Sequence, residues 1–370
     1  MYIVAQHIIS PLGNGTQQNF DQALKGHTGI KLIDDKQLYP SPFYGSRIDN
    51  FEPIPSYTRL ESLFIKSITS TLAQLKDFDK SRTALILSTT KGNIDLLDNQ
   101  QSDFPEERLE LPHMAEVVNS YFDMPAKPVV VSNACISGVS AMLTAQKLIR
   151  SGQYDHAIVS GGDILTEFIV SGFQCLMAID EKPCRPYDKA RAGITLGEAC
   201  ATVVITKDSA GFRPVAKILG GAQSNDANHI SGPSRTGEGL KLSIEQAGEY
   251  AQIDLNKVDY INAHGTATVF NDEMESIAFN RMKLGSKPLN SLKGYFGHTL
   301  GAAGLIETIF AIAQAQNNTL LPTYGFDKLG VSKPLNVVKE VMPLESNPRY
   351  VLKTVSGFGG CNAAIILEVL

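Results

Sequence analysis

The sequence has no long hydrophobic run and no leader-like N-terminus. No window approaches the roughly 18 uninterrupted apolar residues that a transmembrane helix requires. The opening segment MYIVAQHIISPLGNG has no basic leader, no sustained apolar core and no small-residue cleavage site. These absences argue against a membrane-spanning protein and predict a cytoplasmic location.

Charge is also scarce and nearly balanced. Only 19% of the residues are charged, whereas an average soluble domain has about 25%. The 33 basic and 38 acidic residues leave a net charge of −5, which argues against a nucleic-acid partner because nucleic-acid-binding domains carry excess positive charge. With 43% hydrophobic residues, the composition excludes disorder, collagen and coiled coil, and it predicts a large interior extended by an oligomer interface.

Cysteines are few, and they do not occur as closely spaced pairs. The five cysteines are Cys135, Cys175, Cys184, Cys200 and Cys361, and no two of them form a CxxC motif. An odd, scattered set argues against a disulfide framework and a zinc knuckle, and it favours a reducing compartment. At least one thiol is therefore available for chemistry.

Apolar strands alternate with amphipathic helices along the whole chain, which predicts an α/β protein. The expected strands are 2–9, 84–87, 128–131, 156–160, 199–206, 215–219, 258–262, 289–292, 350–355 and 363–369. The expected helices are 16–24 with Thr16 as its cap, 56–75, 114–121, 138–150, 239–251, 272–283 and 302–315.

The order of these elements repeats once. Each half shows three strand–helix pairs and ends with two strands, so the pattern predicts an internal duplication into residues 1–207 and 208–370. Because no low-complexity linker separates the halves, we expect them to share one continuous core.

The segment VVVSNACISGVS at 129–140 has an apolar strand, a tight turn with Cys135 at its tip, and then a helix. This order resembles a nucleophile elbow. At a helix N-terminus the exposed N–H groups and the helix dipole favour a thiolate, so the position predicts a lowered thiol pKa. The alternative is that Cys135 is a small buried hydrophobic residue.

Two histidines lie in similar settings. His264 ends a strand and begins the segment HGTAT, and His298 stands in GYFGHTLGAAG just before a small-residue helix. The duplication places Cys135 and His298 at equivalent turns of the two halves. A cysteine and two histidines at such positions favour an active site over isolated structural residues.

Two other kinds of site use the same residue types. A structural zinc site is disfavoured because its ligands usually come in close sequence pairs, and none does here, so no metal is expected. A papain-like hydrolase is disfavoured because neither histidine is accompanied by a recognisable Asn or Asp motif that would orient it.

The segments together resemble the β-ketoacyl-acyl carrier protein synthases, which are condensing enzymes of the thiolase superfamily. The likeness is to the KAS I/II types in a shortened form. The matching blocks are SPLG at 10–13, RPYD at 185–188, GE at 197–198, HGTAT at 264–268, GHTLGAAG at 297–304 and SGFGGCN at 356–362. They occur in the family's order from end to end of the chain.

This resemblance implies a duplicated, five-layered αβαβα thiolase-like fold and a homodimer, with a heterodimer as the other option. It implies an acyltransferase of fatty acid or polyketide/polyene biosynthesis. Its substrates arrive on the phosphopantetheine of an acyl carrier protein, so no separate cofactor is expected.

The resemblance also implies residue roles. Cys135 would accept an acyl group, while His264 and His298 would assist decarboxylation of a malonyl thioester and stabilise the resulting enolate as neutral donors. The N–H groups of Cys135 and Phe358 would form the oxyanion hole, and Phe358 would gate the acyl pocket.

Four further positions match family residues. Lys293 and Glu307 would form a charged pair behind the histidines, and Thr266 and Thr268 would hold the phosphopantetheine arm. The other cysteines have no motif role and are expected to be packing residues.

Two alternatives remain within the same fold. A non-catalytic chain-length-factor-like subunit would serve a catalytic partner, although such subunits typically lose the cysteine. A thiolase would need a second catalytic cysteine, for which Cys361 is the candidate.

The chain departs from the family between its SPLG block and Cys135, where the interval is shorter. That region normally lines the acyl pocket and the dimer interface. The resemblance therefore leaves the acyl chain length open, and the shortening favours a specialised pathway over housekeeping fatty acid synthesis.

Overall fold

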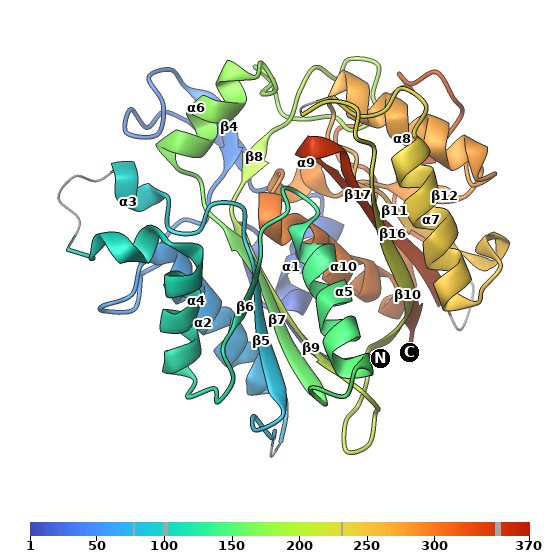
Figure 1. Cartoon of the computed structure of the whole chain (residues 1–370). Helices are drawn as coiled ribbons and strands as arrows, with labels where there is room; N and C mark the ends of the chain where they lie inside the picture. Colours follow the sequence, from blue (N-terminus) through green and yellow to red (C-terminus); the bar gives the residue numbers. More distant parts are fainter. Residues whose placement is uncertain (77, 99–102, 231, 345–348) are drawn as a thin grey trace.

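The computed structural model describes residues 1–76, 78–98, 103–230, 232–344 and 349–370 (Figure 1). A large mixed sheet runs through the molecule, and its two halves repeat one pairing pattern. The first half has the order β1-β9-β7-β5-β6 and the second β10-β17-β16-β11-β12, followed by β14. In each half the first two pairings are antiparallel and the next two are parallel. This repetition confirms the predicted duplication.

The strands have the following bounds. The first half contains β1 (Tyr2–Ser10), β9 (Ala199–Thr206), β7 (His156–Asp163), β5 (Thr83–Ser88) and β6 (Val129–Val131). The second contains β10 (Ala216–Asn225), β17 (Cys361–Val369), β16 (Arg349–Gly357), β11 (Tyr260–Asn262), β12 (Pro288–Asn290) and β14 (Asn336–Val337). Smaller pairings involve β2 (Gly13–Asn14), β3 (Ile30–Ile33), β4 (Phe43–Ser46), β8 (Leu196–Gly197), β13 (Thr319–Leu320) and β15 (Met342–Pro343).

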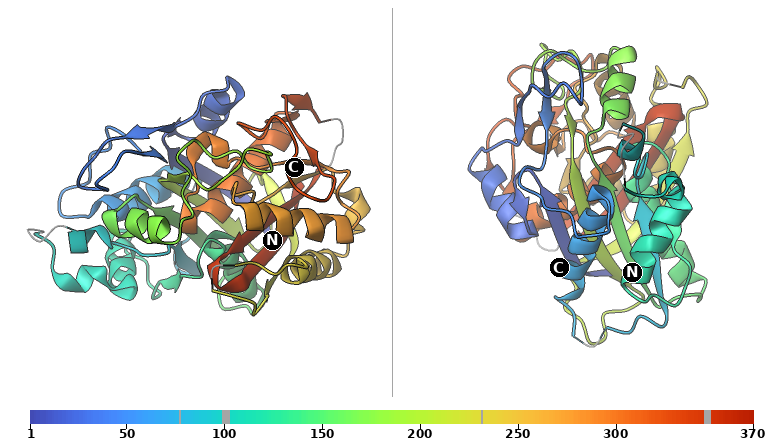
Figure 2. Two further views of the ribbon diagram at one scale, coloured as in Figure 1. Left: turned by 90° about the horizontal axis from the view of Figure 1, so that it is seen from above. Right: turned by 90° about the vertical axis from the view of Figure 1, so that its left-hand side faces the viewer.

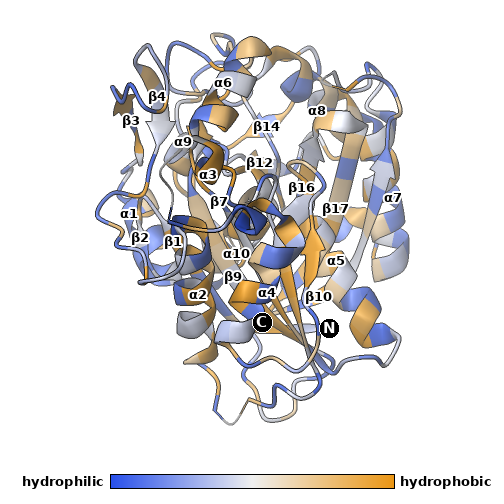
Figure 3. Ribbon diagram, turned by 60° about the vertical axis from the view of Figure 1, so that its left-hand side comes forward, coloured by the Kyte–Doolittle hydropathy of each residue, from blue (hydrophilic) through white to orange (hydrophobic). Residues whose placement is uncertain are grey.

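The middle layer consists of two buried helices, α5 (Ser137–Arg150) and α10 (Ala303–Gln316). They pack against each other between the two halves of the sheet, as Figures 1 and 2 show. All residues of α10 except its last are buried, as expected for a helix that is apolar nearly all round. In Figure 3 the hydrophobic colour gathers on the strands around this layer.

The outer layers cover the remaining sheet faces. Helices α2 (Arg59–Leu72) and α4 (Leu111–Tyr121) lie on the first half, and α7 (Glu238–Ala251) and α8 (Val269–Arg281) lie on the second. The molecule therefore has five layers in the order αβαβα, and the predicted fold class is confirmed. The remaining helical segments are α1 (Thr16–Leu24), α3 (Asp95–Asp98), α6 (Glu167–Cys175), α9 (Lys293–Phe296), η1 (Glu106–Leu109), η2 (Leu255–Lys257), η3 (Leu300–Ala302) and η4 (Phe358–Gly360).

The two halves are joined closely. Strands β1 and β10 pair through Tyr2 with Lys217 and Ile3 with Ala216. The largest hydrophobic cluster draws residues from both halves, from Ile3 to Val369. The expectation of a shared core is met, while the boundary at 207 and 208 stays a prediction.

Some predicted boundaries were wrong. Thr16 does not cap α1; Gly15 is the N-cap and no side chain caps the helix, so Thr16 is the first helical residue. Helix α8 begins at Val269, three residues before the predicted start at Asp272. Among the described helices, none has the length and hydropathy needed to cross a bilayer.

Candidate active site

The three predicted catalytic residues follow strands that lie at equivalent or neighbouring positions in the two halves. Cys135 follows β6 and precedes α5, while His298 follows β12 and precedes η3 and α10. Because β6 and β12 hold the same place in their half-sheets, Cys135 and His298 come from equivalent turns, as predicted. His264 follows β11, the strand next to β12.

The turn that carries Cys135 is sharp. Ala134, directly before the cysteine, has a φ of 44°, in the left-handed region that non-glycine residues rarely adopt. Ser137 secures the turn, because its hydroxyl accepts from the N–H of Asn133 at 2.8 Å and donates to the carbonyl of Ala134 at 2.6 Å. The strand–turn–helix order thus presents the thiol at the start of α5.

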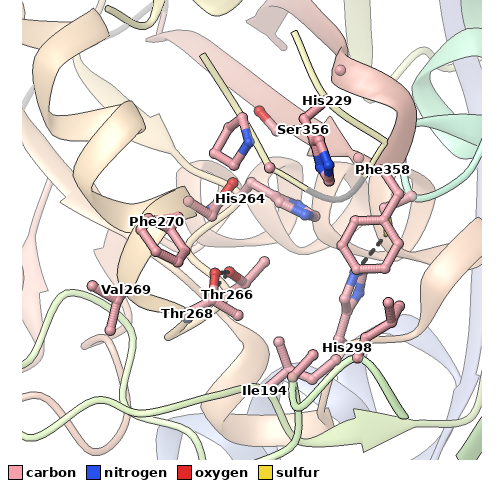
Figure 4. A pocket seen from close by; sticks show the side chains of 18 of the residues that line it. Ile194, His229, His264, Thr266, Thr268, Val269, Phe270, His298, Ser356 and Phe358 are labelled. Carbon is pink, nitrogen blue, oxygen red and sulfur yellow. Dashed lines mark hydrogen bonds between the residues drawn. The ribbon is translucent and has the colours of Figure 1, made fainter. Parts of the chain in front are cut away.

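Cys135 meets His298 directly. The Nε2 of His298 lies 3.0 Å from the Sγ of Cys135, and both side chains are buried. The rings of His264 and His298 meet edge to face with centroids 5.1 Å apart. Figure 4 shows both rings pointing into one cavity, with Phe358 close by. The fold therefore brings the three residues together.

The predicted lowering of the thiol pKa is wrong. Burial raises the pKa of Cys135 to about 11, although the Lys293 cation and a hydrogen bond from the backbone N–H of Phe358 act in the opposite direction. Removal of water from the thiolate outweighs these two favourable interactions. The resting thiol is therefore protonated at neutral pH.

The predicted charged pair lies behind His264. The Nζ of Lys293 is 2.6 Å from a Glu307 carboxylate oxygen, 3.1 Å from the Nδ1 of His264 and 2.5 Å from the His264 carbonyl oxygen. Because an ammonium group only donates, Nδ1 of His264 accepts and the ring proton lies on Nε2. Burial, followed by the Lys293 cation, holds the pKa of His264 well below its ordinary value.

His298 has the same tautomer for a different reason. The N–H of Leu300 donates to its Nδ1 at 3.3 Å, which favours a proton on Nε2, the atom that faces Cys135. Burial, followed by the charges of Lys293 and Lys353, holds the pKa of His298 well below its ordinary value. Both imidazoles are therefore neutral, and Nε2 of His298 directs an N–H toward the thiol.

Sequence reasoning missed Lys353 in β16. Its Nζ lies 2.6 Å from the second carboxylate oxygen of Glu307, so this glutamate pairs with a lysine on each side. The available signal was a single cation within the apolar strand Tyr350–Val355.

Three buried carboxylates that shape the active-site loops were also missed as functional residues. Glu275 accepts from the N–H groups of His264 and Gly265, and Asp272 accepts from that of Thr266. Asp163 accepts from the N–H of Gly301, just after His298. Asp272 and Glu275 could have been noticed in the sequence, because residues three apart lie on the same face of a helix.

A cavity of about 440 Å³ opens above the three residues. Cys135, His264 and His298 line it, together with Thr266 and Thr268, whose hydroxyl oxygens are 2.9 Å apart. Phe358 also lines it and stacks on Phe173 with ring centroids 5.5 Å apart. The predicted arm-binding and gating residues thus border the same cavity, while their roles stay predictions.

The predicted oxyanion-hole groups are close together. Besides the hydrogen bond from the Phe358 N–H to Cys135, a Cβ placed on Gly357 would lie 3.0 Å from the backbone nitrogen of Cys135. The two peptide segments therefore run side by side at the thiol.

Cys135, His264 and His298 each offer a ligand atom, and these atoms lie within 4.8 Å of one another. The trio could thus hold a metal by distance alone. The ammonium groups of Lys293 and Lys353 near the two histidines disfavour a divalent cation there.

The remaining cysteines are placed apart from this chemistry. Cys184 and Cys200 are buried, as expected of packing residues, but Cys175 is exposed, so its assignment as a packing residue was wrong. Cys361 is half-buried, accepts from the Asn225 amide and is not among the residues that line the described cavity.

Comparisons with known proteins show the family. Residues 1–210 match the family model described as beta-ketoacyl synthase, N-terminal domain, and residues 215–327 match its C-terminal domain. A 3-oxoacyl-[acyl-carrier-protein] synthase 2 from Coxiella burnetii is 26% identical, over 98% of this chain and 96% of that protein. A 3-oxoacyl-[acyl-carrier-protein] synthase homolog from Saccharomyces cerevisiae is 31% identical, over 64% of this chain and 58% of that protein.

A solved structure shows the same fold along the full length. One chain of a ketosynthase in complex with its chain length factor, from Xenorhabdus doucetiae, superposes with a TM-score of 0.90. The two chains are 27% identical, and the superposition covers 100% of this chain and 98% of the other. Sequence, fold and the paired turns of the two halves therefore lead to one conclusion: the chain belongs to the beta-ketoacyl synthase family.

Proposed function

We propose that this protein catalyses a decarboxylative Claisen condensation and is a 3-oxoacyl-[acyl-carrier-protein] synthase of fatty acid or polyketide biosynthesis. The observation that carries the proposal is the contact between Cys135 and His298 at the base of a cavity that His264 also lines. A nucleophilic thiol next to two neutral N–H donors suits transfer of an acyl group and stabilisation of an enolate.

The first step transfers an acyl group. The Cys135 sulfur attacks the thioester carbonyl of an acyl carrier, the C–S bond to the carrier breaks, and the thiol proton goes to the departing carrier thiolate. The N–H groups of Cys135 and Phe358 would stabilise the oxyanion. Because the pKa of the thiol is about 11, we expect this step to need the incoming carbonyl in place before the proton leaves.

The second step joins carbon to carbon. Malonyl carrier loses CO₂, and the electron pair of the broken C–C bond forms an enolate whose oxygen accepts from the imidazole N–H groups. The enolate carbon attacks the acyl-Cys135 carbonyl, the Cys135 thiolate leaves and takes up a proton from water, and 3-oxoacyl carrier is released. Neutral histidines suit this step because a fixed donor stabilises the anion without being consumed as an acid.

A second candidate is a non-catalytic chain-length-factor-like subunit. The similar structure from Xenorhabdus doucetiae is a ketosynthase in complex with its chain length factor, so a chain of this fold occurs there in a complex of the two kinds of subunit. The assembled set of Cys135, His264, His298 and Lys293 favours the catalytic role, because a partner subunit has no use for a thiol held against an imidazole.

The test is acyl transfer to the purified chain. Incubation with acyl carrier should add the acyl mass to the peptide that contains Cys135, and C135A should show no adduct. Malonyl carrier should then release CO₂ and yield 3-oxoacyl carrier. If the purified chain alone forms no adduct with acyl carriers of any length offered, the result would favour the partner-subunit role instead.

We also propose an acyl carrier protein as substrate-bearing partner and a homodimer as the assembly. Strand β6 lies at an edge of the central sheet with Val129, Val130 and Val131 half-buried, which suits pairing with another chain. Sedimentation equilibrium of the purified chain should give twice the chain mass, whereas a monomer that dimerises only with a different subunit would indicate a heterodimer. A cytoplasmic location stays a prediction.

A further inference from the structure

Behind the histidines lies a cluster of three buried charges, which we name the Lys–Glu–Lys cluster after Lys293, Glu307 and Lys353. All three side chains are at most 1% exposed. Each Glu307 oxygen binds one ammonium at 2.6 Å. One carboxylate between two ammonium groups gives these three side chains a combined charge of +1.

Lys353 also contacts the strand that leads to His264. Its Nζ lies 3.4 Å from the carbonyl oxygens of Asn262 and Ala263, at the end of β11. It therefore joins three elements that meet behind the site: β16, which carries it, α10, which carries Glu307, and β11. Glu275 of α8 faces the same region, and its charge acts on Lys353.

We propose that Lys353 is a positioning residue: it holds Glu307 on Lys293, keeps His264 in its Nε2–H tautomer, and supplies the net positive charge against which the enolate forms. The proposal rests on the proposed function, because the enolate belongs to that reaction. Without Lys353, the Lys293–Glu307 pair would lose the contact that holds Glu307 in place, and its net charge would be zero.

Fold stability does not account for this lysine. Burying a further ammonium group costs free energy, and apolar residues of similar shape often replace buried ion pairs without loss of stability. Methionine has a similar length and no charge, so it would fill the volume of Lys353 without a second buried ammonium group, although one Glu307 oxygen would lose its donor. We therefore assign the positive charge of Lys353 a role in the site.

The charge of Lys353 acts on both histidines. It lowers the pKa of His264 and of His298, after the larger effects of burial and Lys293. Burial lowers the pKa of Lys353 to about 8, so the net charge of the cluster changes near that pH. Above it the cluster becomes neutral.

The experiment compares K353M, K353Q and K353M/E307Q with the wild type. K217M is the matched control, because Lys217 is a partly exposed lysine of the same sheet. K353M lowers the cluster charge from +1 to 0, and the double variant restores +1 by removing the carboxylate as well. Readouts are the titration of the His264 ring by NMR, malonyl decarboxylation, and thermal unfolding.

We expect K353M and K353Q, at temperatures where thermal unfolding shows them folded, to decarboxylate malonyl carrier about tenfold more slowly than the wild type, comparable to a modest loss of oxyanion stabilisation. The His264 titration midpoint should rise by about one pH unit, because a like charge has been removed. The double variant should return that midpoint toward the wild-type value, and K217M should change neither readout.

Superimposable His264 titration curves for the wild type and both single variants would overturn the proposal, as would a double variant whose midpoint rises further. If K353M does not fold, K353Q decides the question, because its amide keeps a hydrogen-bond donor. The NMR comparison needs no substrate, so wild-type protein that never decarboxylates would refute the proposed function while leaving the result on Lys353 intact.

Discussion

At the scale of single residues, the site distinguishes its two histidines by what each one contacts. His298 touches the thiol of Cys135, whereas His264 is held from behind by Lys293. Roles that looked interchangeable in the sequence therefore separate into one histidine that can act in both steps and one that faces only the cavity.

This difference predicts unequal effects of two alanine substitutions. H264A should leave acyl transfer to Cys135 nearly intact and reduce malonyl decarboxylation by about 10²–10³-fold, because one oxyanion donor is lost. H298A should reduce both, since its Nε2 lies 3.0 Å from the sulfur. Mass spectrometry of the acyl-Cys135 peptide and CO₂ release measure the two steps. Equal loss of acyl transfer in both variants would contradict the assignment.

The raised thiol pKa predicts slow alkylation. With a pKa of about 11, the thiolate of Cys135 is on the order of one thousandth of the total at pH 8, so its reaction with iodoacetamide should keep increasing up to about pH 11. Peptide mapping measures the rate at each pH, with the exposed Cys175 as the internal control. A plateau below pH 8 at Cys135 would show that the helix N-terminus outweighs burial.

At the scale of elements, the site depends on how closely α5 and α10 approach. A Cβ on Gly138 of α5 would lie 2.7 Å from the backbone nitrogen of Leu305, and one on Gly304 of α10 would lie 2.8 Å from that of Val139. Backbone atoms cannot move aside as side chains can, so glycine at these places sets the distance between the helices that follow Cys135 and His298.

We therefore expect G138A to destabilise the fold by about 1–3 kcal/mol, as overpacking does, and to reduce acyl transfer by moving Cys135 relative to His298. Urea denaturation and the acyl-adduct assay measure the two effects. G172A in α6 is the matched control, because nothing lies within 4 Å of its added Cβ. The free energy of unfolding of G172A should increase by about 0.5–1 kcal/mol, because alanine is favoured over glycine within a helix. A G138A protein as stable as G172A would contradict the close approach of α5 and α10.

At the scale of the whole molecule, the duplication does not produce two independent domains. Helix α10 of the second half packs on β9 and α5 of the first, and one hydrophobic cluster includes residues from both. Separating the halves would expose the apolar faces of the middle layer to water.

A fragment of residues 1–207 should therefore not fold alone. We expect it to aggregate or to lack a cooperative thermal transition in circular dichroism, while the full chain unfolds in one transition. Co-expression with residues 208–370 should recover soluble protein if the two pieces complete the shared core. A sharp transition for the fragment alone would show that the first half is an autonomous domain.

The order of the main elements and the duplication could be predicted from the sequence. Its motifs and the family resemblance also singled out Cys135, His264, His298, Lys293 and Glu307, which the fold brings together. Elements can be predicted because the spacing of apolar residues reflects which faces of a helix or strand are buried. The site residues can be found because they lie in short motifs of consecutive residues at strand ends. Helix ends were less certain: Thr16 is a plausible cap by type, but the backbone places Gly15 there instead.

The electrostatics of the site depend on contacts between residues far apart in the chain. The thiol pKa depends on how much water the surrounding layers remove, and a local helix-terminus argument contains no such information. Lys353 and Glu275 come from elements far from Cys135 in the chain, so their contact with the site depends on how the sheet stacks against α8 and α10. Which chemical groups the protein contains can be read from its sequence. Which of them interact depends on packing, because charge interactions, hydrogen bonds and shared cavities depend on distance and burial.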